Sequence, residues 1–419
     1  MAIRAMPVAC RLPMRLRPGP TEEPGKDCEN ALDIRPCHSC PFSRGVACRR
    51  RLCPCVTANT DSPRNGLNFG HLFTDRSNQL LLNQALLTLE RDVDPKATGY
   101  DFGFKLQGMY GSDARYTHFL GELDRATSDR NQFDIVEANV TAHLPLLTAG
   151  GIDAKVGQYP TPIGAEVIDA SGNFFYSHSY IFNFGIPLKH TGFYTTTHVT
   201  DMLDVWLGAD SGVNTSLGNP GDNNDAWSGL GGVGLNLMGG NLTLLALAHI
   251  GPENARTVPE HNSTARQIYD LVAIWKINDK LTSTTEVNYI RDDHFHATAE
   301  GVATYLSYQI NELFSVGGRA EIFRDDQGFF VAAFPSSTNF VSAEQGCTTC
   351  SLSGGKTTYG EITLGVNFKP ASVPKMFDGF VIRPEIRWDQ ALATSGTKPF
   401  DSFTSDHQIT FAADFILPF

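Results

Sequence analysis

Apolar and polar residues alternate along the last eleven residues of the chain, and the alternation runs to the final aromatic residue. Successive side chains of a strand point to opposite faces of a sheet, so this pattern predicts a strand with one wholly apolar face. Such a strand suits a wall between lipid and water, although a half-buried strand of a soluble sheet would alternate in the same way. One row is Ile409, Phe411, Ala413, Phe415, Leu417 and Phe419, and the opposite row is Thr410, Ala412 and Asp414.

The same alternation recurs from residue 78 onward, with turn residues between the segments. Residues 99–110 are a clear example, with Phe102, Phe104 and Leu106 on one face and Asp101, Lys105 and Gln107 on the other. Many segments have the roughly 9–11 residues that a tilted strand needs to cross a bilayer. Only residues 77–90 are ambiguous between helix and strand. The chain therefore predicts an all-β fold, a transmembrane antiparallel barrel of about 14 to 16 strands, because single-chain bacterial barrels have an even number.

Charged residues lie opposite the apolar rows in most of these segments. They would be costly in a soluble core unless paired, but they cost little when they face a water-filled lumen. Residues 160–190 form a long connection that could fold into the lumen and narrow it, or could seal the barrel mouth or pack against a neighbour. The candidates for pore lining or constriction are Lys105, Glu137, Asp153, Lys155, Glu166, Asp169, His178, Lys189, His190, Asp204, Arg319, Glu321, Arg383, Glu385 and Arg387.

Composition and charge narrow the class of protein further. Charged residues make up 19% of the chain, and the charge-free stretch 226–252 is broken by glycines, with residues 238–241 predicting a tight hairpin turn. Two strands fit this stretch better than one membrane-spanning helix. The net charge is −12, with an excess of five positive charges confined to residues 1–60. An acidic body argues against a nucleic-acid partner, which requires a basic face.

The N-terminal residues differ from the rest of the chain. Residues 1–57 are rich in Pro, Arg and Cys and lack a strand or helix period, so we expect a disordered or misassigned segment, followed by the barrel over 58–419. The apolar core of a signal peptide is missing, although an exported barrel needs one, so we expect the native start to differ. A zinc site formed by Cys37-His38-Ser39-Cys40 and Cys53-Pro54-Cys55 is disfavoured, because these residues are irregularly spaced and the segment lacks apolar residues to fold around a metal.

A distinctive block from Gly172 to Gly192, GNFFYSHSYIFNFGIPLKHTG, carries a family resemblance. With residues 59–66 and 110–115, it resembles the OmpL-like β-barrel porin family of bacterial outer-membrane proteins, over about residues 56–419. Members of that family have a first strand before the turn at 59–66. Here residues 55–58 look like a stub of that strand, so we expect the first strand to be missing.

The resemblance and the polar strand faces together predict a porin of the bacterial outer membrane. Small hydrophilic solutes would diffuse passively through its water-filled barrel. The expected partners are outer-membrane lipid and the barrel-assembly machinery, which would recognise the C-terminal strand ending at Phe419. Whether the barrel forms homo-oligomers is left open. The alternatives are a non-conducting structural or receptor barrel, a barrel-borne hydrolase and a soluble extracellular β-protein.

Other motifs do not support an enzyme. Gly229-x-Gly231-x-x-Gly234 matches a dinucleotide fingerprint, but no helix is predicted after it. Ser177, His178 and Ser179 are too close along one segment to converge on a substrate, and His294 with His296 lacks further metal ligands. We expect a local disulfide between Cys347 and Cys350. The sequence predicts no catalytic residues, no cofactor and no metal.

Overall fold

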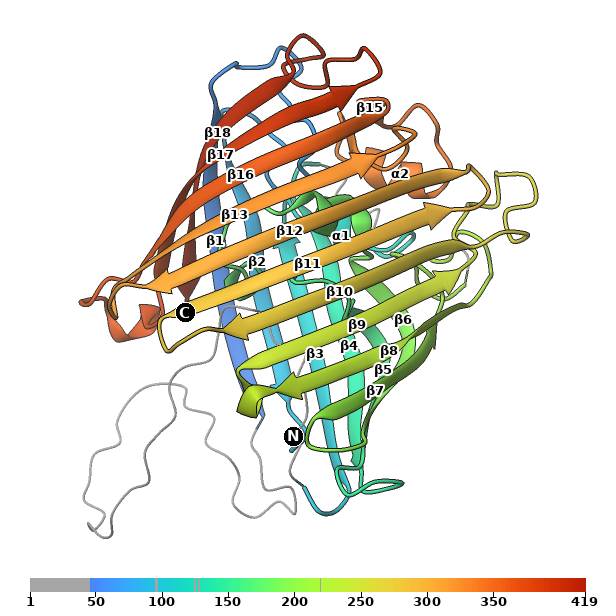
Figure 1. Cartoon of the computed structure of the whole chain (residues 1–419), viewed down its shortest axis with the longest axis vertical. Helices are drawn as coiled ribbons and strands as arrows, with labels where there is room; N and C mark the ends of the chain where they lie inside the picture. The colour runs from blue at the N-terminus through green and yellow to red at the C-terminus, as the bar shows by residue number, and fades with distance from the viewer. Residues whose placement is uncertain (1–45, 95–96, 124–125, 127–128, 219) are drawn as a thin grey trace.

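Sixteen antiparallel strands form a closed barrel in the computed structural model, which describes residues 46–94, 97–123, 126, 129–218 and 220–419. Each strand pairs with its neighbours in chain order, and β1 pairs with β18 to close the wall (Figure 1). The described residues therefore confirm the predicted all-β barrel and an even number of strands.

The barrel strands are β1 Ala47–Asn59, β2 Gln79–Arg91, β3 Asp101–Gly111, β4 Gln132–Leu144, β5 Ile152–Pro160, β6 Lys189–His198, β7 Leu203–Asp210, β8 Ser228–Leu237, β9 Leu242–Gly251, β10 Arg266–Lys276, β11 Leu281–Asp292, β12 Ala297–Gln309, β13 Phe314–Asp325, β16 Thr357–Phe368, β17 Val381–Thr394 and β18 His407–Pro418. The remaining elements are not strands of the wall. They are the two-stranded sheet β14 Ala332–Ala333 with β15 Leu352–Ser353, and the short helices α1 Ala114–Thr117, α2 Asn339–Glu344, η1 Ala170–Gly172, η2 Ile181–Gly185, η3 Met238–Gly240 and η4 Lys375–Phe377.

The first strand corrects two expectations. Strand β1 is present and pairs with both β2 and β18, so residues 47–57 belong to the barrel and the wall does not lack a strand. Only residues 55–58 were expected as a stub of this strand, but it begins at Ala47, and its inward positions include the buried Cys53 and Cys55. Residues 1–45, including Cys37 and Cys40 of the zinc hypothesis, lie outside the described residues, whereas Cys53 and Cys55 are part of β1.

One ambiguous stretch is a strand, and one predicted hairpin is confirmed. Residues 77–90 supply most of β2, and the charge-free stretch 226–252 forms the hairpin of β8 and β9. The hairpin turn uses Gly239 and Gly240, whose φ values of 67° and 91° suit glycine. Within the described ranges, no helix is long and apolar enough to cross a membrane.

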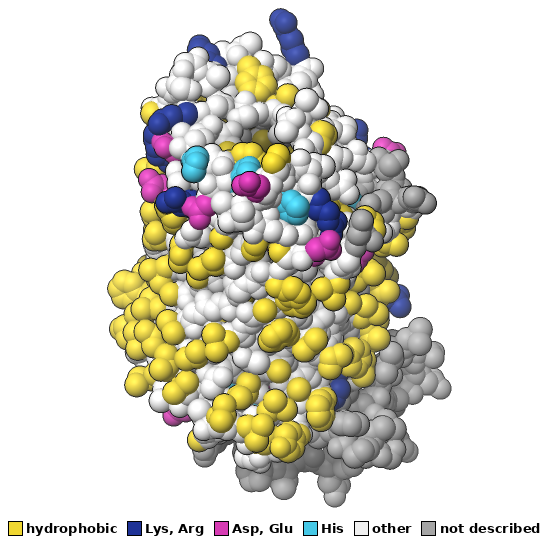
Figure 2. All heavy atoms as spheres, turned by 90° about the vertical axis from the view of Figure 1, so that its right-hand side faces the viewer, with side chains coloured by type: hydrophobic (Ala, Val, Ile, Leu, Met, Phe, Trp, Pro, Cys, Tyr) yellow, Lys and Arg dark blue, Asp and Glu magenta, His cyan; other side chains and the backbone are white. Residues whose placement is uncertain are grey.

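The outside of the wall is apolar. The strand residues Val140, Leu207 and Leu364 are 57–63% exposed, whereas polar residues of the same strands are buried inside. In Figure 2, apolar side chains form a broad band across the lower part of the face in view, with most of the visible charged groups above it. An outward apolar band with polar interior positions is the pattern of a transmembrane barrel.

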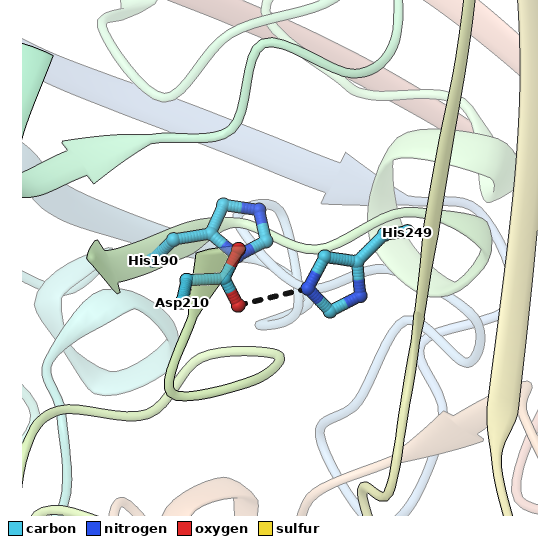
Figure 3. A group of neighbouring side chains, drawn as sticks. All are labelled: His190, Asp210 and His249. Carbon is cyan, nitrogen blue, oxygen red and sulfur yellow. Dashed lines mark hydrogen bonds and ion pairs between the residues drawn. The ribbon is translucent and has the colours of Figure 1, made fainter. Parts of the chain in front are cut away.

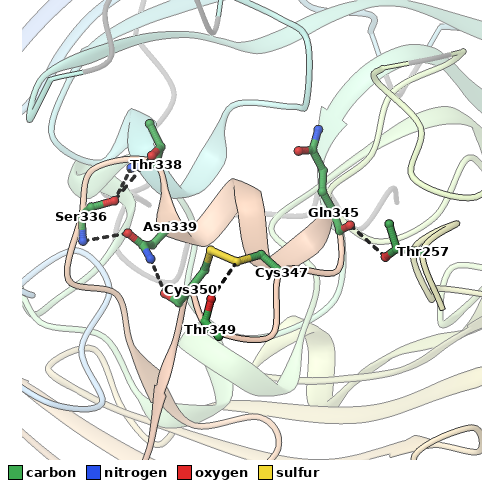
Figure 4. The surroundings of a disulfide bond; sticks show 8 residues. All are labelled: Thr257, Ser336, Thr338, Asn339, Gln345, Cys347, Thr349 and Cys350. Atoms are coloured by element: carbon green, nitrogen blue, oxygen red, sulfur yellow. Dashed lines mark hydrogen bonds between the residues drawn. A yellow bond between two sulfur atoms is a disulfide. The ribbon is translucent and has the colours of Figure 1, made fainter.

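The two rims of the barrel differ. Connections such as 199–202 and 277–280 are tight turns, and we call this end the turn rim. Long connections, among them 161–188 and 326–356, occupy the opposite end, which we call the loop rim. The predicted disulfide between Cys347 and Cys350 is confirmed in the 326–356 loop (Figure 4).

Candidate functional site in the barrel lumen

The connection between β5 and β6, residues 161–188, folds into the lumen; we call it the lumen loop. Its apolar side chains Ile163, Ile168 and Phe182 are buried in the interior cluster. Helix η2, in its second half, contacts the inner faces of β11 and β12. Residues 160–190 were predicted either to enter the lumen or to seal the mouth, and the structure shows the first arrangement.

Carboxyl groups of the wall hold the lumen loop through its backbone. Glu321 on β13 accepts hydrogen bonds from the N–H groups of Tyr180 and Ile181, at 2.6 and 2.8 Å. Glu385 on β17 accepts two more from residues 176–177, at 2.8 and 3.0 Å. The irregular backbone of a loop must find such partners when it is buried. These contacts satisfy donors that no strand or helix pairs.

Arginines of the wall bind the carbonyl groups of the same loop. Arg319 on β13 donates to the carbonyl oxygen of Ser177 at 2.7 Å and pairs with Glu166 at 2.8 Å. Arg383 and Arg387 on β17 also donate to loop carbonyl oxygens. Burial raises the pKa of the Glu166 carboxyl above its ordinary value, and the Arg319 guanidinium offsets part of that rise. The wall therefore supplies acceptors for N–H groups of the loop and donors for its carbonyl groups.

His178, in the lumen loop, is buried among aromatic side chains. The centre of its ring lies 4.9 Å from the centre of the Phe73 ring and 4.1 Å from that of the Phe182 ring. Burial lowers the pKa of His178 well below its ordinary value, and the guanidinium groups of Arg319 and Arg387 lower it further. A neutral ring packed between aromatic side chains is a structural element of the loop.

A water-accessible stretch of wall lies toward the turn rim on β2 to β6. The side chain of Lys105 is 31% exposed and its Nζ lies 2.6 Å from Glu137 and 3.8 Å from Glu90. The ammonium of Lys155 lies 5.6 Å from the centre of the Tyr194 ring. We call this stretch, which includes Asp153, the open wall. The Lys105 ammonium thus lies between carboxyl groups of the two neighbouring strands.

Almost the whole barrel matches one known protein family. The family model described as "Putative beta-barrel porin-2, OmpL-like" matches residues 55–419. The chain belongs to this OmpL-like porin family. No protein among the curated sequences is similar enough to the chain to match it.

Solved porin structures share the fold of this OmpL-like family member. The anion-selective porin from Comamonas acidovorans has a TM-score of 0.55 at 10% identity, covering 90% of this chain and 100% of that chain. OmpF from Salmonella typhi, in complex with daunomycin, has a TM-score of 0.55 at 7% identity, covering 90% and 98%. OprB from Pseudomonas putida has a TM-score of 0.52 at 13% identity, covering 89% and 94%. At these identities the likeness shows the fold alone.

The structure divides the predicted pore-lining residues into two groups. Four are partly exposed, namely Lys105, Asp153, Lys155 and Asp169. The others are buried, namely Glu137, Glu166, His178, Lys189, His190, Asp204, Arg319, Glu321, Arg383, Glu385 and Arg387. Most residues of the buried group bind the lumen loop or pair with other wall residues. Contact of these residues with a solute stays a prediction, and the structure supports it best for the four partly exposed residues.

The lumen loop of this OmpL-like porin returns to the wall through a buried ion pair. The Lys189 ammonium lies 2.6 Å from the carboxylate of Asp134 and donates to the carbonyl oxygen of Ile135 at 2.8 Å. The Phe119 ring covers it at 4.1 Å. A buried ammonium requires such complete pairing. Lys189 therefore fastens the loop.

Sequence reasoning missed several charged groups of the interior. Glu90 was not proposed, because the period of residues 77–90 was ambiguous. His143 and His198 both contact Asp153, at 2.7 and 3.3 Å, and neither histidine was singled out. Residue 143 does lie on the polar face of its strand, so the alternation contained the signal for it.

Proposed function

We propose that the protein is an outer-membrane porin through which small hydrophilic solutes diffuse passively. The observation that carries the proposal is a closed barrel with an apolar outer belt and a polar inner face, part of which is water-accessible at the open wall. Membership of a porin family supports it. Solutes would pass between the open wall and the lumen loop.

The charges of the open wall indicate weak selectivity. Lys105 and Lys155 face the same space as Asp153 and Glu137, so neither sign dominates. Rings of one charge would be needed for strong discrimination between ions. We infer a general diffusion pore with a mild cation preference, in line with the acidic net charge of the chain.

We infer that the barrel is not a hydrolase. In the described part of the chain, neither ring nitrogen of His178 has a hydrogen-bond partner, and Arg319 donates to the Ser177 hydroxyl at 3.2 Å. A serine nucleophile would need a base within hydrogen-bond reach. Replacing Ser177 and His178 by alanine should leave lipid turnover at the level of the unaltered barrel.

A non-conducting structural or receptor barrel is the second candidate. The observation that favours it is the fastening of the lumen loop, since wall carboxyl groups and arginines bind its backbone at successive positions. A loop held in this way can close a lumen as well as narrow it. The same experiment separates the two candidates.

The test is conductance of the full chain, refolded in detergent and inserted into planar bilayers. Folding is checked first, by the shift in gel mobility that heating causes in intact barrels. Stepwise conductance that rises in proportion to salt would support the porin, and the reversal potential in a KCl gradient would report its ion preference. Silent bilayers with fully folded protein would overturn the porin and favour the non-conducting barrel.

A further inference from the structure

Three fully buried side chains meet inside the barrel wall near the loop rim. They are His190 on β6, Asp210 on β7 and His249 on β9 (Figure 3). Asp210 Oδ1 lies 2.9 Å from His249 Nε2, and Asp210 Oδ2 lies 3.3 Å from His190 Nδ1. One nitrogen or oxygen atom of each residue lies within 4.8 Å of the other two. The carboxyl group is thus placed between two imidazoles.

The outer nitrogens of both imidazoles face oxygen atoms. His190 Nε2 lies 3.0 Å from the hydroxyl of Thr161, and His249 Nδ1 lies 3.8 Å from the carboxyl of Glu253. Each ring therefore turns one nitrogen toward Asp210 and the other toward an outer oxygen. For His190, the Thr161 hydroxyl can accept the Nε2–H and leave Nδ1 as the ligand atom, an orientation common among imidazoles that bind a metal, whereas Nδ1 of His249 has no hydrogen bond among the described residues.

Several atoms at this place lack a hydrogen bond within the described residues. They include Nδ1 of His190 and Oδ2 of Asp210, both fully buried. Buried polar atoms in proteins are nearly always satisfied. If His190 donates its Nε2 proton to Thr161, its Nδ1 lone pair faces a carboxylate oxygen. That arrangement requires a proton or a cation between the two atoms.

We propose that His190, Asp210 and His249 bind one divalent transition metal of the zinc type. The ligands are Nδ1 of His190, a carboxylate oxygen of Asp210 and Nε2 of His249. Two imidazoles and one carboxylate suit zinc, whereas magnesium and calcium prefer oxygen ligands throughout. The dication would also balance the negative charges of Asp210 and the neighbouring Glu253. Zinc bonds to imidazole nitrogen and carboxylate oxygen measure about 2.0–2.2 Å.

The metal would fasten the lumen loop to the wall. His190 lies one residue after the start of β6, where the loop ends, and Asp210 is the last residue of β7. Thr161, at the other end of the loop, orients His190. A bound ion would therefore join both ends of the lumen loop to β7 and β9. This inference does not depend on conduction, because a closed barrel would need the same fastening.

The experiment is a zinc titration of the refolded full chain, purified without a histidine tag. Its free cysteines are alkylated first, because the thiols of residues 1–60 could bind zinc. We expect one zinc per chain, and at least hundredfold weaker binding in Asp210→Asn and His249→Gln. Thr161→Val should weaken binding about tenfold, as for other groups that orient a ligand. The matched control is His198→Gln, because His198 also contacts two carboxyl groups, Asp204 and Asp153.

X-ray absorption of the zinc-loaded unaltered chain provides a readout that does not depend on how variants fold. Imidazole and oxygen neighbours with no sulfur would support the site. Binding that is absent from the folded unaltered chain would overturn it, and so would equal loss in His198→Gln or retention in Asp210→Asn. In those cases the three residues would form a hydrogen-bonded network with protons between them.

Discussion

The contact between Glu321 and the lumen loop allows a quantitative prediction. In Glu321→Ala, the N–H groups of Tyr180 and Ile181 lose their acceptors, which lie at 2.6 and 2.8 Å. Each buried N–H left unsatisfied costs about 1–3 kcal/mol, so docking of this part of the loop should weaken by about 2–6 kcal/mol. Since about 1.4 kcal/mol changes an equilibrium tenfold, the undocked population should rise by about 30-fold to about 20,000-fold. Glu321→Gln retains one acceptor oxygen, so its undocked population should lie between those of the unaltered barrel and Glu321→Ala.

The assay is hydrogen exchange of residues 176–188 in detergent, read by mass spectrometry. Faster exchange in this segment, with an unchanged rate in the strands, is the expected result. Glu137→Ala is the matched control, because Glu137 is another buried lumen carboxyl whose close partner is Lys105 rather than the loop. Equal protection of the segment in Glu321→Ala and in the unaltered barrel would refute the reasoning. It would mean that other contacts hold this part of the loop.

Three further predictions follow from the lumen, the loop rim and the C-terminal strand. Lys105→Glu should shift the reversal potential in a KCl gradient toward stronger cation preference, because it reverses a charge on the open wall; an unchanged potential would place the path elsewhere. Burial raises the pKa of Glu344 to about 8 and that of Asp113 to about 7, so both bind a proton more tightly in the folded than in the unfolded chain. The loops that carry them should therefore gain stability as the pH falls from about 8 toward 5, and slower hydrogen exchange at the lower pH, after correction for the intrinsic rate, would check this. Deleting Phe419 should lower the amount of barrel assembled in cells while refolding in detergent continues, and equal amounts in membrane fractions would contradict the assembly role of this residue.

Much of the wall could be predicted from the sequence. A barrel strand has a two-residue period that is local, so the apolar and polar rows of β3, β4 and β18 could be assigned without any knowledge of their neighbours. The family resemblance over the lumen loop pointed to the same architecture. Only the end of β1 was recognised, because its inward positions include two cysteines and because three consecutive arginines, 49–51, lie within the strand, so its alternation is interrupted.

The contents of the lumen depended on tertiary structure. Alternation shows that Arg319 and Glu321 point inward, but it cannot show whether they meet water or another segment of the chain. The long loop fills much of that space, and the inward groups bind its backbone because buried peptide groups must find partners. His190, Asp210 and His249 are also far apart in sequence, and the pairing of β6 to β9 brings them together. The sequence by itself determined the faces of the strands, and only the closed barrel decided which groups face one another across them.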